Sequence, residues 1–346
     1  MLFHAFLSKP WAVFALVGKM KRKLRVAQFG LGPIGLECLR LAESKPWVRI
    51  IGGIDVDPVK IRRNLGELTG VKGLRSLPVV GSADELKQKP DVIFHTAVSQ
   101  FKTAYAQLEP LVRRGINVVS SCEELVFPQL REPTLAAKLD RLCRKSGARI
   151  VGTGVNPGFV MDLLPLCLTV VSQEIRAIHI RRVVNASTRR QSLQRKIGSG
   201  LAPEEFQRRF LAGKAGHAGL QESLALIAHT LGWNTSKIQE TGEAVVARKD
   251  ICTKYLQVRR GETCGLHQRA EAKVDGHIRI TLDLKMYLDA QDPHDAIRIE
   301  GSPPMDLMIR GGIAGDQATV AALVNTAPRL LRAEPGLRLV TELPVA

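Results

Sequence analysis

The chain has 346 residues, of which 45% are hydrophobic and 24% charged, a balance typical of a globular protein with two domains. Its formal net charge is +17, but the basic residues are spread along the chain, only 5% of residues are aromatic, and no RNA-binding or zinc-finger signature is present, so no nucleic-acid partner is expected. Six irregularly spaced cysteines without a CxxC pair predict free thiols in a reducing cytoplasm and no metal site.

The first nineteen residues match no common targeting signal. Residues 1–19 are apolar but interrupted by Lys9 and Pro10, and a basic cluster follows them. A secretory signal has its basic residues first, and the segment is short for a membrane span. We therefore expect a poorly ordered extension or an over-called start, with the natural start at Met20 and no membrane association. A membrane anchor is the alternative.

A dinucleotide-binding fingerprint follows at once. A predicted strand at 26–29 leads into Gly-Leu-Gly-Pro-Ile-Gly, which opens a predicted helix, and a second strand is predicted at 48–54. Gly30 permits the tight turn, Gly32 the close approach of the backbone to the pyrophosphate, and Gly35 the close packing of helix on strand. The helix N-terminus offers its N–H groups to the phosphates. The predicted cofactor-binding residues of this stretch are Gly30, Gly32, Pro33, Ile34 and Gly35.

Asp55 ends the second strand, twenty residues after Gly35, where a carboxylate accepts hydrogen bonds from the adenosine ribose. Because a carboxylate at this place repels the 2′-phosphate of NADP, NAD is favoured. Arg62 and Arg63 follow in a segment, 58–68, that we predict to be helical. They can reach a 2′-phosphate if this loop folds back, or they can form a solvated helix face, so the use of both cofactors stays open.

The following pattern of apolar strands and amphipathic helices predicts a parallel sheet. Strands are predicted at 78–81, 91–97, 116–121 and 148–153, and helices at 103–114, 131–146 and 161–171. Ligands bind outside the carboxyl ends of strands in such sheets. Thr96 and Ala97, at the end of one strand, are therefore predicted to contact the cofactor. We interpret His95, inside the same strand, as a core histidine rather than as an acid or base.

Two carboxylates come directly after the strand at 116–121. Glu123 and Glu124 should lie on the binding edge of the sheet, where one of them can act as an acid or base or hold a substrate amine. The alternative is that both open the next helix and complement its dipole. Position alone does not separate these readings. No histidine is placed to activate the neighbouring Cys122, which we interpret as a packing residue.

A second domain is predicted from the change of pattern near residue 175. Asn156 precedes it, in an Asn-Pro-Gly turn sequence, and can hold nicotinamide or substrate. The predicted fold class is α/β, with an N-terminal doubly wound parallel sheet of the Rossmann type and a second α+β domain with a mainly antiparallel sheet. Asp316 is expected to N-cap a C-terminal helix. The β-rich runs are 175–184, 245–258 and 267–288, and the segment 192–242 between them is expected to be largely helical. The predicted parts are the extension at 1–19, a dinucleotide-binding domain at 20–160, a substrate and dimerisation domain at 161–308, and a C-terminal helix, at 309–346, that returns to the dinucleotide-binding domain.

The motifs and their order along the chain resemble those of proteins with the dihydrodipicolinate-reductase-like N-terminal domain. It is most similar to the branch of 2,4-diaminopentanoate dehydrogenases and native amine dehydrogenases. The resemblance covers almost everything after Met20. The matching stretches are VAQFGLGPIG (26–35), NVVSSCEEL (117–125), GTGVNPGFVMDLLP (152–165), KIGSGL (196–201), EEF (204–206), GHAGLQESLALIAHTLGW (216–233) and GDQATVAALVN (315–325).

The resemblance implies an NAD(P)-dependent oxidoreductase that acts on a CH–NH2 group and forms a homodimer. Such an enzyme deaminates an amine or amino acid oxidatively, or aminates a ketone reductively with ammonia. In this branch a glutamate of the CEEL stretch is the acid/base and amine-binding residue. That role is carried over to Glu123 first and to Glu124 as the second choice.

One departure from the wider family concerns the substrate. Dihydrodipicolinate reductases carry a His-His-x-x-Lys motif early in the second domain, and the corresponding residues 180–200 contain no histidine pair. Reduction of dihydrodipicolinate is therefore not expected. Asn185, Arg189 and Arg190 can bind a substrate carboxylate, arginine through its bidentate fork, or they can belong to a solvated basic loop.

Two other functions remain open from the sequence. The first is a related dehydrogenase of the homoserine or aldehyde type on the same scaffold, which would not need ammonia. The second is a non-catalytic redox sensor that binds NAD(P) without turnover. Two acids at the predicted binding edge of the sheet argue against the sensor.

Overall fold

The computed structural model describes residues 22–344, so the extension predicted at 1–19 lies outside the described residues. The described chain forms two compact units. The first comprises the residues up to Gly154 together with those from Asp316 onward, and the second is Val155–Gly315. Within the described part, no helix is both long and apolar enough to cross a membrane.

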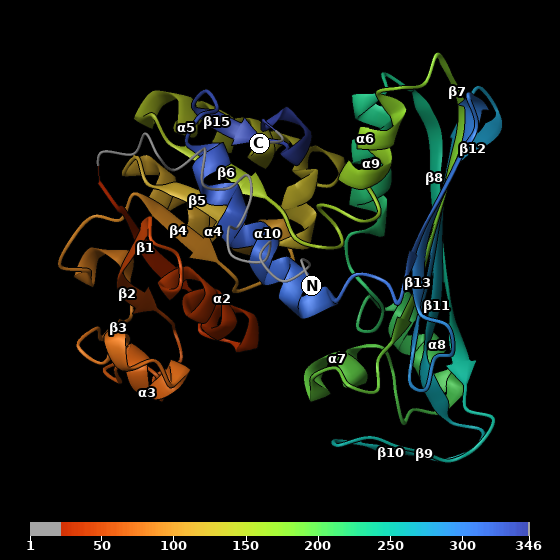
Figure 1. The fold of residues 1–346 in the computed structure, drawn as a ribbon, viewed down its shortest axis with the longest axis horizontal. Coiled ribbons are helices and arrows are strands. Elements are labelled where there is room, and N and C mark those ends of the chain that lie inside the picture. The colour runs from red at the N-terminus through yellow and green to blue at the C-terminus, as the bar shows by residue number, and fades with distance from the viewer. Residues whose placement is uncertain (1–21, 345–346) are drawn as a thin grey trace, which may run out of the picture. The chain divides into compact units, whose positions relative to one another are not determined.

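The first unit is built on a parallel β-sheet (Figure 1). Seven strands of the described residues pair in the order β15-β6-β5-β4-β1-β2-β3, and each pairing is parallel. The strands are β1 (Leu24–Phe29), β2 (Val48–Ile54), β3 (Val79–Val80), β4 (Val92–His95), β5 (Asn117–Ser120), β6 (Arg149–Gly152) and β15 (Gly336–Arg338). After β3 the chain returns to β4 on the other side of β1, so the switch point of this doubly wound sheet lies between β1 and β4.

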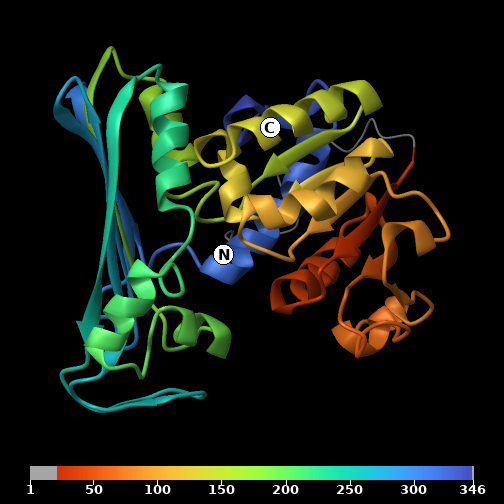
Figure 2. The same ribbon diagram turned by 180° about the vertical axis from the view of Figure 1, so that it is seen from behind.

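The connecting helices cover both faces of this sheet. Because parallel crossovers are right-handed, the reversal of strand order places α4 and α5 on the face opposite to α2, as Figures 1 and 2 show from two sides. The helices of this unit are α2 (Pro33–Glu43), α3 (Leu65–Thr69), α4 (Phe101–Arg113), α5 (Pro133–Ser146) and α10 (Gly315–Leu330, its first residue in the second unit). Short 3₁₀ helices lie at Lys72–Leu74, Ala83–Glu85, Glu123–Val126, Pro128–Leu130 and Val340–Glu342.

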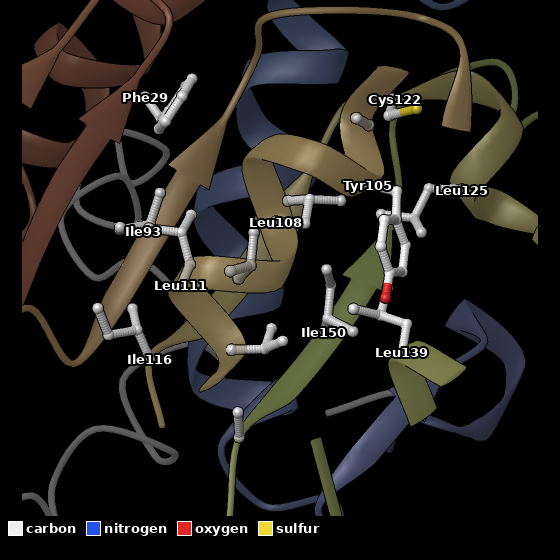
Figure 3. Packing of buried hydrophobic residues seen from close by; sticks show 14 of the residues in the cluster. Phe29, Ile93, Tyr105, Leu108, Leu111, Ile116, Cys122, Leu125, Leu139 and Ile150 are labelled. Atoms are coloured by element: carbon white, nitrogen blue, oxygen red, sulfur yellow. The ribbon is translucent and has the colours of Figure 1, made fainter. Parts of the chain in front are cut away.

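The core of the first unit lies between the sheet and α4 and α5. Figure 3 shows Leu108 and Leu111 of α4 packed with Ile93 of β4, Ile150 of β6 and Leu139 of α5, all of them buried. Strands covered by helices on both faces bury almost every side chain, which explains their nearly continuous apolar sequences. The core therefore holds the carboxyl ends of β1, β4 and β5 in a fixed register.

The second unit contains a mixed sheet with mostly antiparallel pairings. Its order is β14-β13-β7-β12-β11-β8, and of its neighbours only β12 and β7 are parallel within the described residues. The strands are β7 (Glu174–Asn185), β8 (Thr235–Val246), β11 (Thr263–Val274), β12 (His277–Tyr287), β13 (His294–Ser302) and β14 (Met305–Arg310), with a separate pair β9 (Ile251–Cys252) and β10 (Gln257–Val258). The helices are α6 (Leu163–Thr169), α7 (Gln191–Lys196), α8 (Pro203–Leu211) and α9 (Leu220–Thr230).

The predicted fold class is confirmed, because a parallel doubly wound sheet and a mainly antiparallel sheet are both present. The helix predicted at 58–68 is wrong over most of its length, since only Leu65–Thr69 is helical. The helix begins only at Leu65 because the Asn64 side chain caps α3, accepting a hydrogen bond from the Glu67 N–H. The preceding backbone bonds to β3 instead, through Arg62 N to Val79 O and Val79 N to Arg63 O.

Three further expectations need correction. The segment expected to be largely helical does contain α7, α8 and α9, but its end, from Thr235, is strand β8. Strands β13, β14 and β15 were not predicted, and β15 extends the parallel sheet beyond β6. Asp316 is the second residue of α10 and not its N-cap. The errors about strands share a cause, since edge and half-exposed strands carry polar side chains and give no continuous apolar signal.

Candidate functional site

The glycine-rich turn after β1 has the geometry of a phosphate-binding loop. Gly30 has a φ of 88°, and a Cβ on it would lie 2.9 Å from the carbonyl oxygen of Thr96. A Cβ on Gly35 would overlap the carbonyl oxygen of Gly30 and lie 2.8 Å from Thr96 Oγ1. A Cβ on Gly32 would meet no atom within 4 Å. Two glycines are thus required by the protein's own packing, whereas Gly32 faces open space.

Helix α2 presents an N-terminus suited to an anion. Gly32 is its N-cap and carries no capping side chain, Pro33 occupies the first turn, and no acidic residue lies there. Free N–H groups and the positive end of the helix dipole are therefore available at Ile34 and Gly35. Together with the open space at Gly32, these features fit the pyrophosphate of a dinucleotide.

Asp55 is buried at the end of β2 and already bound on both carboxylate oxygens. Its Oδ2 accepts hydrogen bonds from the Leu31 N–H (2.7 Å) and from Lys60 Nζ (3.1 Å), and its Oδ1 accepts one from the Asp57 N–H (2.9 Å). Burial opposes ionisation, but these hydrogen bonds outweigh it and hold the pKa of Asp55 below its usual range. Asp55 is thus an ionised acceptor that also fixes the glycine-rich turn.

Thr96 also stabilises the glycine-rich turn. Its Oγ1 donates to the Gly30 carbonyl oxygen (2.9 Å) and accepts from the buried Gln28 amide (2.9 Å). The next residue, Ala97, is exposed at the end of β4. Of these two predicted cofactor contacts, Thr96 thus shapes the turn from behind, and Ala97 presents backbone and methyl group to solvent.

The two glutamates after β5 have different surroundings. Glu124 accepts a hydrogen bond from the Phe101 N–H at the start of α4 (2.8 Å) and forms an ion pair with Arg131 (3.5 Å). Both of its oxygens therefore hold the protein together. Glu123, one residue nearer to the end of β5, is half-buried and begins a 3₁₀ helix. The register of Phe29 with His95, and of His95 with Ser120, brings the glycine-rich turn and Glu123 to the same edge of the sheet.

The side chains of His95 and Cys122 are structural. His95 lies 2.8 Å from Ser120 Oγ through Nδ1 and 2.8 Å from Gln107 Oε1 through Nε2, and burial lowers its pKa to about 4. Its ring is therefore neutral at neutral pH. Burial raises the pKa of the Cys122 thiol, so it is not a nucleophile. The six cysteines are all free.

Asn156, in the second unit, is 8% exposed and lies against His217. His217 Nε2 is 3.2 Å from Asn156 Nδ2 and 3.1 Å from the Asn156 carbonyl oxygen. Burial, with Lys196 adding to it, lowers the pKa of His217 to about 3, so its ring is neutral and one nitrogen carries the proton. Asn156 Oδ1 is buried without a hydrogen-bond partner among the described residues. It is an acceptor available to a ligand N–H or O–H group.

Asp162 fixes the turn that carries Asn156. Its Oδ2 accepts hydrogen bonds from the Gly158 N–H and from Ser223 Oγ, both at 2.7 Å, and its Oδ1 accepts one from the Leu163 N–H (2.6 Å). Burial raises the pKa of Asp162 against the effect of these donors. The Asn-Pro-Gly sequence is therefore a turn, as its composition predicts, and one that is tied to α6 and α9.

Two of the three predicted substrate ligands of the second unit, Asn185 and Arg189, differ in their contacts. The Asn185 side chain donates to the Ala290 carbonyl oxygen (3.1 Å) and accepts from the Ser187 N–H (3.0 Å), so it stabilises the turn after β7. Arg189 lies with its guanidinium against Gly315, where a Cβ would overlap it. The positive charges of Lys196, Arg182 and Arg189 all act on His217. Asn156 and Arg189 therefore belong to one cationic neighbourhood.

Sequence reasoning missed three residues of these sites. Lys60 lies in a segment that was predicted to be helical. Lys196 and His217 lie in stretches that resemble the family, but no role was predicted for them. Asn156 and His217 are separated by 61 residues, and no local pattern relates them. Among the residues that the structure describes, no three His, Cys, Asp or Glu side chains are grouped to hold a metal ion.

Comparison with known proteins gives a consistent result. Residues 159–346 match the family model of the 2,4-diaminopentanoate dehydrogenase C-terminal domain. The chain is 30% identical over 331 residues to the 2,4-diaminopentanoate dehydrogenase of Acetoanaerobium sticklandii, covering 93% of this chain and 94% of the other. It is 24% identical over 348 residues to an amine dehydrogenase of Streptomyces virginiae, covering 92% and 95%. The solved amine dehydrogenase of Mycobacterium smegmatis is similar in structure, with a TM-score of 0.83 at 21% identity, over 94% of this chain and 97% of that one.

Proposed function

We propose, from the premise that this chain belongs to the 2,4-diaminopentanoate dehydrogenase family, that Glu123 is the acid/base of an amine dehydrogenase reaction. The resemblance noted in the sequence is confirmed, and the chain is an oxidoreductase that acts on a CH–NH2 group with a nicotinamide cofactor. The proposed reaction is oxidative deamination of an amine or amino acid to a ketone and ammonia, or the reverse amination. The partners are thus a small amine or ketone and ammonia.

The observation that carries the role of Glu123 is its position, one residue nearer than Glu124 to the end of β5. Glu124 is held by the Phe101 N–H and Arg131, so it is committed to structure. Glu123 lies at the same sheet edge as the glycine-rich turn, because β1, β4 and β5 are in register there. A carboxylate at this edge can exchange a proton with a substrate amine.

The proton balance assigns Glu123 its task. An alkylammonium substrate must lose one proton before its carbon can release a hydride, and the Glu123 carboxylate accepts that proton. The bound nicotinamide would accept the hydride. Loss of proton and hydride leaves an iminium ion, whose charge the protein must stabilise. Addition of water and cleavage of the C–N bond then give the ketone and ammonium. Reductive amination requires Glu123 to return the proton.

Residues of the first unit fit the cofactor. We propose that Gly30, Gly32, Pro33, Ile34 and Gly35 form the pyrophosphate site, that Asp55 accepts the ribose hydroxyls, and that Thr96 and Ala97 form the adjoining wall. NAD is proposed as the preferred cofactor because Asp55 is ionised. In the second unit, Asn156 and Arg189 are proposed to contact nicotinamide or substrate. A cytoplasmic homodimer is also proposed, and the free thiols support a reducing location.

Ammonium dependence tests the reaction. Oxidation of NADH and NADPH is followed by absorbance with a panel of ketones and keto acids, with and without ammonium. We expect consumption only when ammonium is present, because the C–N bond needs a nitrogen donor. Consumption without ammonium would instead indicate an alcohol- or aldehyde-type dehydrogenase. Binding of NADH without turnover of any substrate would favour a redox sensor.

The ribose role of Asp55 gives a second test. Asp55→Ala is expected to weaken NADH binding by about 10–100-fold, the scale of one or two hydrogen bonds to a charged acceptor, and NADPH binding by less. The reason is that the carboxylate binds the free 2′-hydroxyl but repels a 2′-phosphate. Dissociation constants are measured by nicotinamide fluorescence. Equal losses for both cofactors would contradict the ribose assignment.

A further inference from the structure

Lys60 makes a contact at the predicted ribose site that no sequence motif indicates. Its Nζ lies 3.1 Å from Asp55 Oδ2 and 3.7 Å from Asp57 Oδ2. The Lys60 side chain is 28% exposed, whereas that of Asp55 is 9% exposed. The ammonium group therefore covers the acid on its solvent side.

We propose that Lys60 is the residue that lets NADP compete with NAD in this protein. Paired with Asp55, the Lys60 ammonium offsets the negative charge that would repel a 2′-phosphate. Its flexible stem also lets the ammonium donate directly to phosphate oxygens. This inference rests on the proposed function, since it assumes the cofactor site at Asp55.

The backbone holds Lys60 in place from both sides. Asp57 begins a turn in which its side chain accepts from the Val59 N–H (3.0 Å) and its carbonyl oxygen accepts from the Lys60 N–H (3.0 Å). On the other side, the backbone of Arg62 and Arg63 is hydrogen-bonded to Val79. The loop is therefore fixed at both ends, and the short distance from Lys60 to Asp55 is a property of its fold.

The same loop presents an apolar surface next to the charged pair. Val56 and Val59 are each 72% exposed. They flank the chain between Asp55 and Lys60. An adenine ring, whose ribose Asp55 would hold, can be covered by such side chains. The exposed valines thus support adenosine binding on this side of Asp55.

Arg62 and Arg63 are weaker candidates than Lys60 for binding a 2′-phosphate. Arg63 forms an ion pair with Glu67 of α3 (3.5 Å), which directs it to the helix surface. Arg62 is exposed and has a φ of 71°, a conformation that non-glycine residues seldom adopt. Neither guanidinium has a contact with Asp55 among the described residues. Arg62 is therefore the alternative phosphate ligand, and Arg63 the control.

The test measures cofactor binding by the whole protein. Dissociation constants for NADH and NADPH are determined by fluorescence, and those for 5′-AMP and adenosine 2′,5′-bisphosphate by calorimetry, since the latter pair reports the adenosine end alone. We compare wild type with Lys60→Gln, Lys60→Arg, Arg62→Gln and Arg63→Gln. Wild type should bind both reduced cofactors with affinities within about tenfold of each other, or 1.4 kcal/mol.

Lys60→Gln is expected to weaken NADPH and the bisphosphate by about 10–100-fold, the scale of a charge-assisted hydrogen bond, and NADH and AMP by less than about threefold. Lys60→Arg should retain most of the NADPH affinity, and Arg63→Gln should behave as wild type. Equal losses for NADH and NADPH, no loss with Lys60→Gln, or a selective loss with Arg62→Gln alone would overturn the inference. If wild type binds NADH but not NADPH, only this inference fails. If it binds neither, the proposed function fails with it.

Discussion

Glu123→Gln is expected to lower kcat for reductive amination by about 10²–10⁴-fold, the usual contribution of a positioned acid or base. The amide cannot exchange the proton that the amine must lose or gain, and it does not stabilise the positive charge of the iminium ion. The substitution keeps the size of the side chain. NADH binding and the thermal unfolding temperature should therefore change little, and kcat is measured with ammonium at saturation.

Glu124→Gln is the matched control, since it makes the same chemical change one residue further on. Its amide oxygen can still accept the hydrogen bond from the Phe101 N–H, but the ion pair with Arg131 is lost. Such a partly exposed pair contributes about 0–1 kcal/mol to the free energy of unfolding. We therefore expect a small loss of stability with nearly normal kcat. If Glu124→Gln loses turnover and Glu123→Gln does not, the two roles are exchanged.

The parts of the fold that were predicted most accurately from the sequence are those determined by the pattern of neighbouring residues. Strands such as β1 and β4 are buried on both faces and consist of apolar runs, so their positions were predicted closely. The glycine-rich turn was predicted because Gly30 and Gly35 meet geometric demands that other residues do not satisfy. Strand β8, in contrast, has both faces partly exposed and carries mostly polar residues, so no period of two appears in it.

The candidate site was predictable only where it follows a strand end. Glu123 and Glu124 could be placed at the sheet edge because parallel strands end at a common edge, but their separate surroundings could not be predicted. The Phe101 N–H that holds Glu124 is 23 residues away in the chain. Lys60 was missed for a related reason. Its segment looks helical in composition, and only Asn64 and the backbone bonds to β3 turn it towards Asp55.

Gly35→Ala is expected to lower the stability of the protein and Gly32→Ala its NADH affinity, although both remove a glycine from the same turn. The new Cβ of Gly35→Ala would overlap the carbonyl oxygen of Gly30, a backbone atom that cannot rotate away. Helix α2 must then move from β1, and overpacking of this kind lowers the free energy of unfolding by about 1–3 kcal/mol. Thermal or urea unfolding of the protein without cofactor should show this loss directly.

Gly32→Ala should leave the protein without cofactor almost unchanged in stability. The φ of Gly32 is −74° and its ψ −178°, a conformation open to alanine, and no atom lies within 4 Å of the new Cβ. The loss should appear in binding, where NADH affinity falls by about 10–100-fold because the methyl group occupies space that the pyrophosphate needs. Normal NADH binding by a stable Gly32→Ala variant would show that the phosphates do not approach this backbone. Since the space beside Gly32 is empty in the protein's own packing, only a ligand can make its glycine necessary.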